Sequence, residues 1–339
     1  MQRVLSSLIS LAVMALFTAT ALAADDSAPV QPKQKKQSAK TAKVRKDSPA
    51  RPTPDFADLS YGPDPQNKMD VWLAKSGKPT PLLVNIHGGG FMAGDKKILS
   101  ATLLNGLLKA GISVASINYR LTTTPAPLPI PQHDSARAIQ FLRSKAKEFN
   151  LDPTRVAVCG GSAGAGISLW MAFHKDMAKP DDADPIARQS TRVSCVTTWG
   201  AQCSYDPHVL QEWCGPNVIE CKWLLPAYGV KTSAELNDPK LQPIYDEVSA
   251  IKHLTKDAPP ALLIYNQPNI KVEPTDASGK NVHHPLFGYK VKELMDKFGC
   301  ECRIVNTKEG DYANLKPAEQ TERSQMEAVD FLSKHLLEK

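Results

Sequence analysis

The stretch Arg155–Gly166, RVAVCGGSAGAG, constrains the fold more than any other part of the chain. An apolar run that gives way to glycines and then to small residues predicts a buried strand turning sharply into a helix, with Ser162 at the turn. Glycines are needed because such a turn strains the backbone and brings the helix close to the strand. The turn would lift the Ser162 hydroxyl above the sheet, where the helix N-terminus favours negative charge.

Apolar strands and helices alternate along the rest of the chain. The predicted strands are 69–74, 80–86, 112–120, 155–161, 192–200, 260–266 and 300–306, and the predicted helices are 98–110, 133–149, 163–174, 285–297 and 318–337. This order predicts an α/β fold with a doubly wound, mostly parallel sheet. Residues 201–255, rich in Trp, Pro and Cys, interrupt the alternation and are interpreted as an inserted cap within a domain spanning 55–339.

The N-terminal residues read as a targeting signal. Arg3 precedes an uncharged apolar run that ends in Ala21-Leu22-Ala23, which predicts a signal peptide over residues 1–23 and an exported, periplasmic or extracellular protein. A retained membrane anchor is the alternative. No second run is long enough to span a membrane.

The segment that follows is basic and almost free of apolar residues, so residues 24–54 are expected to form a disordered tether. Residues 25–51 carry eight Lys or Arg against three Asp, whereas residues 52–339 carry no net charge. The tail could rest on an anionic cell surface or serve as a solvated spacer. Nothing in the charge pattern argues for nucleic acid, and the sequence assigns no oligomeric state.

Seven cysteines in an exported chain allow disulfides. Cys159 lies in the strand before Ser162 and is expected to be a buried free thiol. A bridge among Cys203, Cys214 and Cys221 is plausible because they fall close together in one irregular region.

Two glycine-rich motifs point to acyl-transfer chemistry. The first is the G-x-S-x-G motif Gly160-Gly161-Ser162-Ala163-Gly164, in the strand–turn–helix context that it requires. The second is His87-Gly88-Gly89-Gly90, at the end of a buried strand about 70 residues earlier. Backbone N–H groups of the second motif, with that of Ala163, can form a donor pocket for an oxyanion. Close packing and a phosphate cradle are the respective alternatives, and His87 is expected to shape its loop.

The segments NIHGGGF, SINYRL and DSARAIQFLRSKAKEFNLDPTRVAVCGGSAGAG resemble the α/β-hydrolase esterases, within the hormone-sensitive-lipase-like and bacterial feruloyl-esterase-like group. The resemblance covers about residues 55–339. It implies a small-molecule ester substrate, no cofactor and no metal. By position, Ser162 matches the nucleophile; Gly88, Gly89 and Ala163 match the oxyanion donors; and Asp134 matches an acid that is usually structural.

The resemblance fails at the remaining catalytic positions. The family acid would fall near Asn269, with Glu273 and Asp276 as nearby substitutes, and the family histidine would fall at Asp311. Asp311 is a poor replacement, because an ordinary Asp carboxylate has a pKa of about 3.9 and accepts protons weakly at neutral pH. A serine hydroxyl without a base is a poor nucleophile.

His283 and His284 are the remaining candidates for the base, since they follow a strand at the carboxyl edge of the sheet. The alternatives are that both cap or pack the helix beginning near Pro285, or that they bind a metal with Asp276. The first hypothesis is therefore an exported serine hydrolase with an acyl-Ser162 intermediate and an improvised base, His284 or His283. The second is a pseudo-hydrolase that binds a ligand or an envelope component without turnover.

Overall fold

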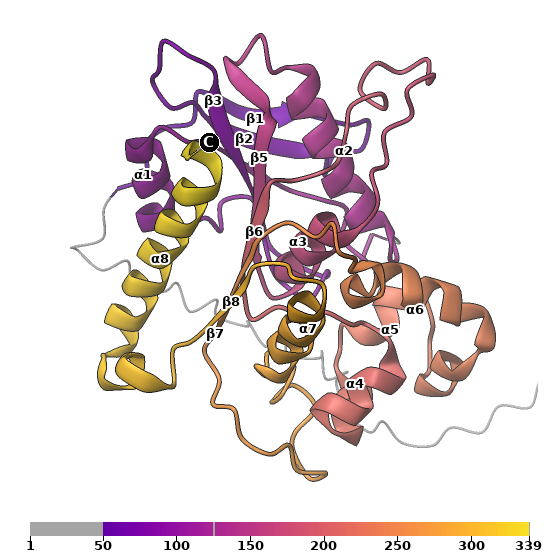
Figure 1. Ribbon diagram of the computed structural model, residues 1–339. Helices are drawn as coiled ribbons and strands as arrows, with labels where there is room; N and C mark the ends of the chain where they lie inside the picture. The colour runs from indigo at the N-terminus through magenta and orange to yellow at the C-terminus, as the bar shows by residue number, and fades with distance from the viewer. Residues whose placement is uncertain (1–49, 125, 339) are drawn as a thin grey trace, which may run out of the picture. The chain divides into compact units, whose positions relative to one another are not determined.

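The computed structural model of the protein describes residues 50–124 and 126–338 (Figure 1). One eight-stranded sheet runs through them in the order β1-β2-β4-β3-β5-β6-β7-β8. β1 pairs antiparallel with β2 and β2 with β4, and every other neighbouring pair is parallel. The strands are β1 (Phe56–Ser60), β2 (Lys68–Trp72), β3 (Thr80–Ile86), β4 (Ser113–Ile117), β5 (Leu151–Gly161), β6 (Cys195–Trp199), β7 (Ala261–Tyr265) and β8 (Cys302–Asn306). The predicted mostly parallel α/β fold is confirmed.

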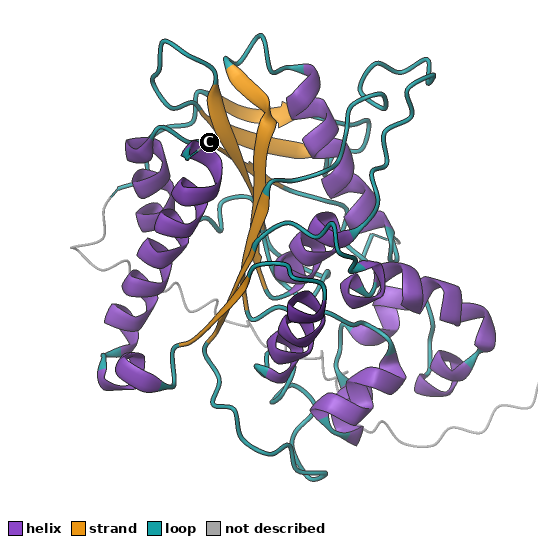
Figure 2. Ribbon diagram, in the orientation of Figure 1, coloured by secondary structure: helices purple, strands orange, loops and turns teal. Residues whose placement is uncertain are grey.

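Helices cover both faces of this sheet (Figure 2). α1 (Ala101–Ala110) and α8 (Pro317–Leu337) share one apolar core with alternate residues of the strands, such as Leu83. α2 (Ile130–Ser144), α3 (Ala163–Phe173) and α7 (Leu286–Lys297) share the other core, which contains Leu82 and Val84. Because both faces are covered, β3, β4 and β7 are buried along their whole length, which explains their uninterrupted apolar sequences.

Short helices occupy the segment between β6 and β7, where the sequence predicts the cap insertion, residues 201–255. They are α4 (Pro207–Cys214), η1 (Pro216–Glu220), α5 (Leu224–Tyr228), η2 (Ser233–Asn237), η3 (Pro239–Leu241), α6 (Gln242–Val248) and η4 (Ala250–His253). In Figure 1 they lie beside α3 and α7. The insertion therefore lies on the face of the sheet that α3 covers. The turn at Ser162, between β5 and α3, is the elbow.

The start of the described chain is held against the domain, although the sequence predicts a tether as far as residue 54. Asn105 Nδ2 donates to the Ala50 carbonyl at 3.1 Å, and Trp72 Nε1 donates to the Pro52 carbonyl at 2.8 Å. These two hydrogen bonds lie within the range that the sequence assigns to the tether. The predicted signal peptide, 1–23, and residues 24–49 lie outside the described residues. Within the described part of the chain, no helix has the length and hydropathy needed to cross a membrane.

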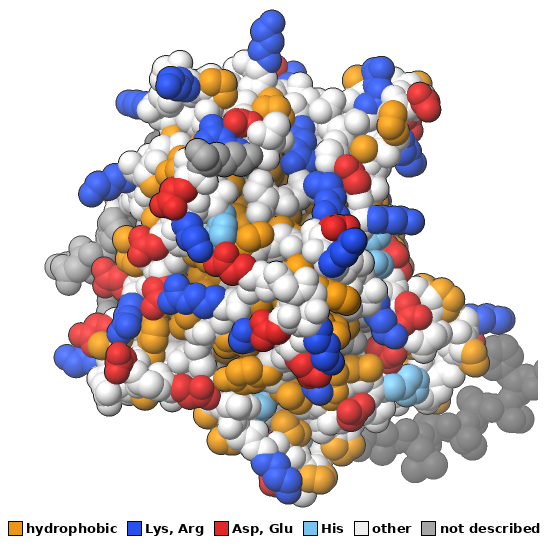
Figure 3. Space-filling model, in the orientation of Figure 1, with side chains coloured by type: hydrophobic (Ala, Val, Ile, Leu, Met, Phe, Trp, Pro, Cys, Tyr) orange, Lys and Arg blue, Asp and Glu red, His pale blue; other side chains and the backbone are white. Residues whose placement is uncertain are grey.

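Acidic and basic side chains are interspersed on the face of the molecule in Figure 3. Such mixing agrees with the absence of net charge over residues 52–339. No large field of one sign covers this face, so it offers no basic surface for a polyanion.

Candidate active site

Ser162 sits at a strained turn between β5 and α3. Its backbone angles are φ 52° and ψ −122°, a left-handed conformation that a non-glycine residue rarely adopts. Two hydrogen bonds hold the turn: the Ser162 N–H donates to the Trp199 carbonyl at 2.9 Å, and the Ser162 carbonyl accepts from the Gly166 N–H at 3.0 Å. The hydroxyl is half-buried and lines a cavity at the carboxyl end of the sheet. Strain of this kind is typical of functional sites.

Glycines let the turn close against β3. A Cβ at Gly164 would lie 2.1 Å from the Ile86 carbonyl oxygen, and a Cβ at Gly160 would lie 2.5 Å from the Gly164 carbonyl group. No side chain fits in those gaps, so the two glycines set how closely α3 approaches the strands.

His283 reaches Ser162 from the loop between β7 and α7. Its Nε2 lies 2.8 Å from Ser162 Oγ, a hydrogen-bonding distance. The ring packs against Gly200, where a Cβ would come within 3.3 Å of three His283 side-chain atoms. Burial lowers the pKa of His283. The imidazole is therefore neutral at pH 7, with a lone pair available for the hydroxyl proton.

In the described part of the chain, the side-chain hydrogen bond of His283 is the one between Nε2 and Ser162 Oγ, and no carboxylate is hydrogen-bonded to its Nδ1. Asp311 lies in η5 (Gly310–Asn314) with an exposed side chain, outside the cavity around Ser162. Between β8 and η5, Thr307 and Lys308 line the cavity. Asp311 therefore does not take part in the serine–histidine pair.

His284 does not meet Ser162, because its ring is committed to its own loop. Nε2 donates to the Ile270 carbonyl at 2.8 Å, and Nδ1 accepts from the Leu286 N–H at 3.1 Å. Both ring nitrogens are thus occupied at the start of α7. Of the two histidines, His284 packs at the start of α7, as one alternative from the sequence has it. His283 is the one that contacts Ser162.

Asp276, another predicted candidate, stabilises the loop that carries His283. Its carboxylate accepts from the Glu273 N–H, the Lys280 ammonium and Asn281 Nδ2. These contacts lower the pKa of Asp276 to about 2, and the hydrogen bond from Lys280 has the largest effect. Asn281 Nδ2 also donates to the Cys214 carbonyl at 3.1 Å, which ties the loop to α4.

Three cysteines of the cap insertion hold the same loop. Each thiol donates to a backbone carbonyl in or just after the loop: Cys221 to Ser278 at 2.9 Å, Cys214 to Asn281 at 3.4 Å, and Cys203 to Phe287 at 3.4 Å. All three are free, as is buried Cys159, so the predicted bridge among them is absent. Their thiols contact the histidine loop, a role that sequence spacing alone could not reveal.

The His87–Gly90 loop lies directly against the elbow. A Cβ at Gly88 would be 2.6 Å from the Gly161 carbonyl oxygen and 3.3 Å from Ser162 Cβ, while Gly89 adopts φ 118°. Among the described residues, no backbone carbonyl accepts from the N–H groups of Gly88, Gly89 or Ala163. These donors are therefore available to a bound ligand beside the hydroxyl.

His87 shapes this loop and transfers no proton to Ser162. Its Nδ1 donates to the Gly88 carbonyl at 2.8 Å, and its ring stacks on Tyr119 at 4.3 Å. Burial lowers its pKa. Asp134 is also structural, because it forms a two-pronged ion pair with Arg120 at 2.6 and 2.9 Å.

Two cavities meet at the Ser162–His283 pair. The larger, about 770 Å³, extends past Gly88 and Gly89 to α1 and α8, where Leu103 and Gln320 line it. The smaller, about 210 Å³, is lined in part by aromatic side chains. Its lining includes Phe91, Tyr205, Trp223, Ala163 and Val282.

Comparison with known proteins agrees with this architecture. The probable carboxylic ester hydrolase LipM of Mycobacterium tuberculosis is 28% identical over 229 residues, 66% of this chain and 50% of that protein. Esterase LipC of the same organism is 34% identical over 209 residues, 60% of this chain and 49% of that protein. The chain thus spans about half the length of the curated relatives it matches.

Solved esterase structures share the fold. The Thermogutta terrifontis esterase Est2, with propionate bound, superposes with a TM-score of 0.60 at 18% identity, covering 86% of this chain and 98% of that one. The acetyl ester-xyloside bifunctional hydrolase of Caldicellulosiruptor lactoaceticus gives 0.59 at 22% identity, over 78% and 88%. The BD-FAE family model matches residues 69–279, more than half of the chain. The chain therefore belongs to the BD-FAE family of α/β-hydrolases.

Proposed function

We propose that the protein is an exported serine hydrolase that cleaves a carboxylic ester through an acyl-Ser162 intermediate. The observation that carries the proposal is the 2.8 Å separation of Ser162 Oγ and His283 Nε2 beside N–H groups that have no backbone acceptor among the described residues. A nucleophile within hydrogen-bond reach of a base is the arrangement that acyl transfer requires. The names of the curated relatives support the same reaction class.

In this mechanism Ser162 Oγ attacks the ester carbonyl carbon as its proton passes to His283 Nε2. The carbonyl oxygen becomes an oxyanion that accepts hydrogen bonds from the N–H groups of Gly88, Gly89 and Ala163. His283 then gives the proton to the leaving alcohol as the C–O bond breaks, and water repeats the sequence to release the acid. In a well-studied serine protease, removing one such donor costs about 10²- to 10³-fold in rate.

The two cavities support a short acyl group and a larger alcohol. The 770 Å³ cavity suits the alcohol, which must accept a proton from His283 and leave, while the small volume of the 210 Å³ cavity limits the acyl chain. We therefore expect acetyl and propionyl esters to be cleaved faster than octanoyl esters.

Trp223→Ala should raise the octanoate-to-acetate ratio of kcat/KM by about tenfold or more, because a few misfitting methylenes cost about 1–3 kcal/mol each. Hydrolysis of p-nitrophenyl esters of increasing acyl length measures this ratio. Trp213→Ala is the matched control, since Trp213 packs on Phe287 and lines neither cavity. An unchanged ratio in Trp223→Ala would assign the acyl chain to the larger cavity instead.

The activity should depend on pH through His283. Only the neutral imidazole accepts the serine proton, and burial lowers its pKa below the ordinary 6.5. We expect kcat/KM to be constant between about pH 7 and 8 and to fall on acidification, with its midpoint below pH 6.5. A pH profile with a soluble activated ester tests this; a midpoint above pH 6.5 would mean that another group limits the reaction.

Among the described residues no carboxylate is hydrogen-bonded to His283 Nδ1, and this favours a second candidate, a pseudo-hydrolase that binds an ester or envelope component without turnover. A fluorophosphonate probe and an activated ester distinguish the two. Ser162-dependent labelling with burst release of the alcohol supports the enzyme. If neither the wild type nor Ser162→Ala is labelled, and both still bind the ligand, the result supports the pseudo-hydrolase.

Export is proposed from the sequence of residues 1–23 alone. N-terminal sequencing of the protein recovered from an expressing cell should find Ala24 as the first residue. Recovery of intact Met1 or Gln2 in the membrane fraction would instead support a retained anchor.

A further inference from the structure

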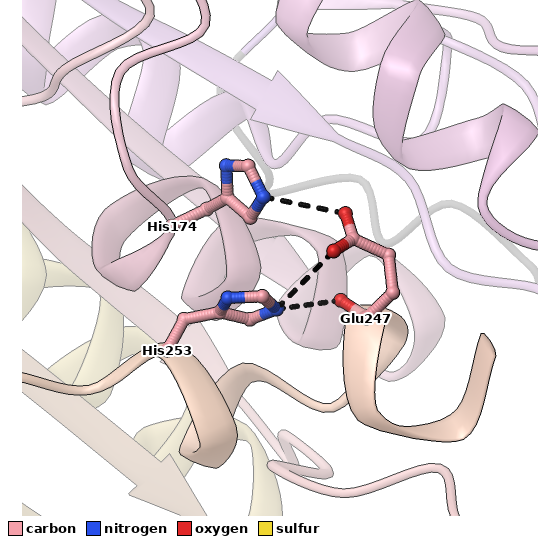
Figure 4. A group of neighbouring side chains, drawn as sticks. All are labelled: His174, Glu247 and His253. Atoms are coloured by element: carbon pink, nitrogen blue, oxygen red, sulfur yellow. Dashed lines mark hydrogen bonds and ion pairs between the residues drawn. The ribbon is translucent and has the colours of Figure 1, made fainter. Parts of the chain in front are cut away.

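A cluster of two histidines and one glutamate lies at the far end of α3 from Ser162. His174 follows the last turn of α3, Glu247 belongs to α6 and His253 ends η4. Figure 4 shows both imidazole rings directed at Glu247. One ligand atom from each of the three residues lies within 4.8 Å of the others. Nothing in the ester chemistry proposed above uses these groups.

The hydrogen bonds of His174 leave a lone pair facing a carboxylate. His174 Nδ1 lies 2.8 Å from the Lys175 carbonyl, which only accepts, so Nδ1 carries a proton. His174 Nε2 lies 3.2 Å from Glu247 Oε1, which also only accepts when ionised. The ring is buried, with 7% of its side chain exposed. In the neutral ring Nε2 carries a lone pair, so a cation between Nε2 and Glu247 Oε1 would interact favourably with both atoms.

The spacing suits a tetrahedral metal ion. Zinc–ligand bonds of about 2.0–2.2 Å at tetrahedral angles place neighbouring ligand atoms roughly 3.3–3.6 Å apart. This is close to the 3.2 Å between His174 Nε2 and Glu247 Oε1. His253 Nε2 is 3.9 Å from Glu247 Oε2. This nitrogen now bonds to the Glu247 carbonyl at 2.7 Å. The carbonyl would keep a second donor, Trp170 Nε1 at 2.7 Å, if His253 turned to a metal.

We propose that His174, Glu247 and His253 bind one Zn²⁺ ion, through the two imidazoles and the carboxylate. Two imidazoles and a carboxylate are donors that zinc accepts, and half-exposed Glu247 leaves the fourth position open to water. The eleven residues of α3, about 16 Å of helix, separate this site from Ser162. The ion would join the end of α3 to the cap insertion and take no part in ester cleavage.

The test uses the untagged protein after treatment with a chelator. Calorimetric titration with Zn²⁺ should give one ion bound per chain, and titration with Co²⁺ should give the visible absorption bands of a tetrahedral complex. Glu247→Gln keeps the shape of the side chain and should weaken binding by at least about tenfold. Zn²⁺ should also raise the Tm of the wild type and leave that of Glu247→Gln unchanged.

Glu301→Gln is the matched control, because Glu301 pairs with a single histidine, His335, at 3.4 Å. It should bind Zn²⁺ as the wild type does. If Glu247→Gln fails to fold, His253→Gln provides the same comparison from the other side of the site. Binding of less than one ion, or equal weakening in Glu301→Gln and Glu247→Gln, would overturn the proposal and leave a histidine–carboxylate ion pair.

Discussion

Replacing His283 by alanine should lower kcat/KM for ester hydrolysis by about a hundredfold, far less than histidine removal costs a complete triad. In a well-studied serine protease, losing the triad acid alone costs roughly 3 × 10⁴ in kcat and losing all three residues costs about 2 × 10⁶. Once the acid is gone, the histidine therefore accounts for a remaining factor of about 10². His283 has no hydrogen-bond partner at Nδ1 among the described residues, so its loss should cost what histidine loss costs when the triad acid is already missing.

The size of the effect is as informative as its direction. A loss of about a hundredfold corresponds to about 2.7 kcal/mol of transition-state stabilisation. A loss approaching a millionfold would mean that a carboxylate joins His283 when substrate binds. No loss at all would remove His283 from the reaction.

His284→Ala is the control for this measurement, because it removes a neighbouring histidine of the same loop. It should change kcat/KM by only a few fold while lowering the free energy of unfolding by about 1–2 kcal/mol, since two hydrogen bonds at the start of α7 are lost. Single-turnover kinetics and urea unfolding of both variants separate the two roles. The reverse pattern would contradict the assignment of His283 as the base.

The sequence identifies the histidine loop but cannot choose between its two histidines. Whether His283 or His284 points at Ser162 depends on the backbone angles of a loop without regular structure, and these are set by contacts with distant residues. Gln202 donates to the Val282 carbonyl at 2.6 Å, and Asn281 bonds to Cys214. No local pattern encodes such contacts.

The strands and the elbow are predictable for the opposite reason. β3 is mostly apolar and β5 carries an apolar run over residues 156–159, and the elbow glycines follow from a turn whose geometry only small residues allow. The edge strand β1 is missed, because it is short and half-exposed and shows no alternation. Physical constraints that act within a few residues can be predicted from the sequence, whereas constraints that act between distant parts of the fold cannot.

Gly164→Ala should destabilise the protein by about 3 kcal/mol or more and abolish labelling of Ser162. The new methyl group would lie 2.1 Å from the Ile86 carbonyl and 2.5 Å from the His87 carbonyl. Both contacts are with backbone, so neither can yield by a side-chain rotation. Relief requires α3 to move away from β3, which separates Ser162 and the Ala163 N–H from the Gly88 loop. Overpacking of this kind typically costs 1–3 kcal/mol, and more where backbone is forced apart.

Gly161→Ala, in the same turn, supplies the matched control. Its methyl group would meet only the Trp199 carbonyl, at 3.9 Å, and Gly161 does not have a positive φ. This variant should keep the wild-type midpoint in urea unfolding and the wild-type rate of fluorophosphonate labelling. If Gly164→Ala behaved like Gly161→Ala, the close approach of α3 to β3 would not be what holds the Ser162 hydroxyl beside the N–H groups. Both the catalytic and the ligand-binding proposals depend on that approach, because each needs the hydroxyl and the donors on the same side of one bound carbonyl group.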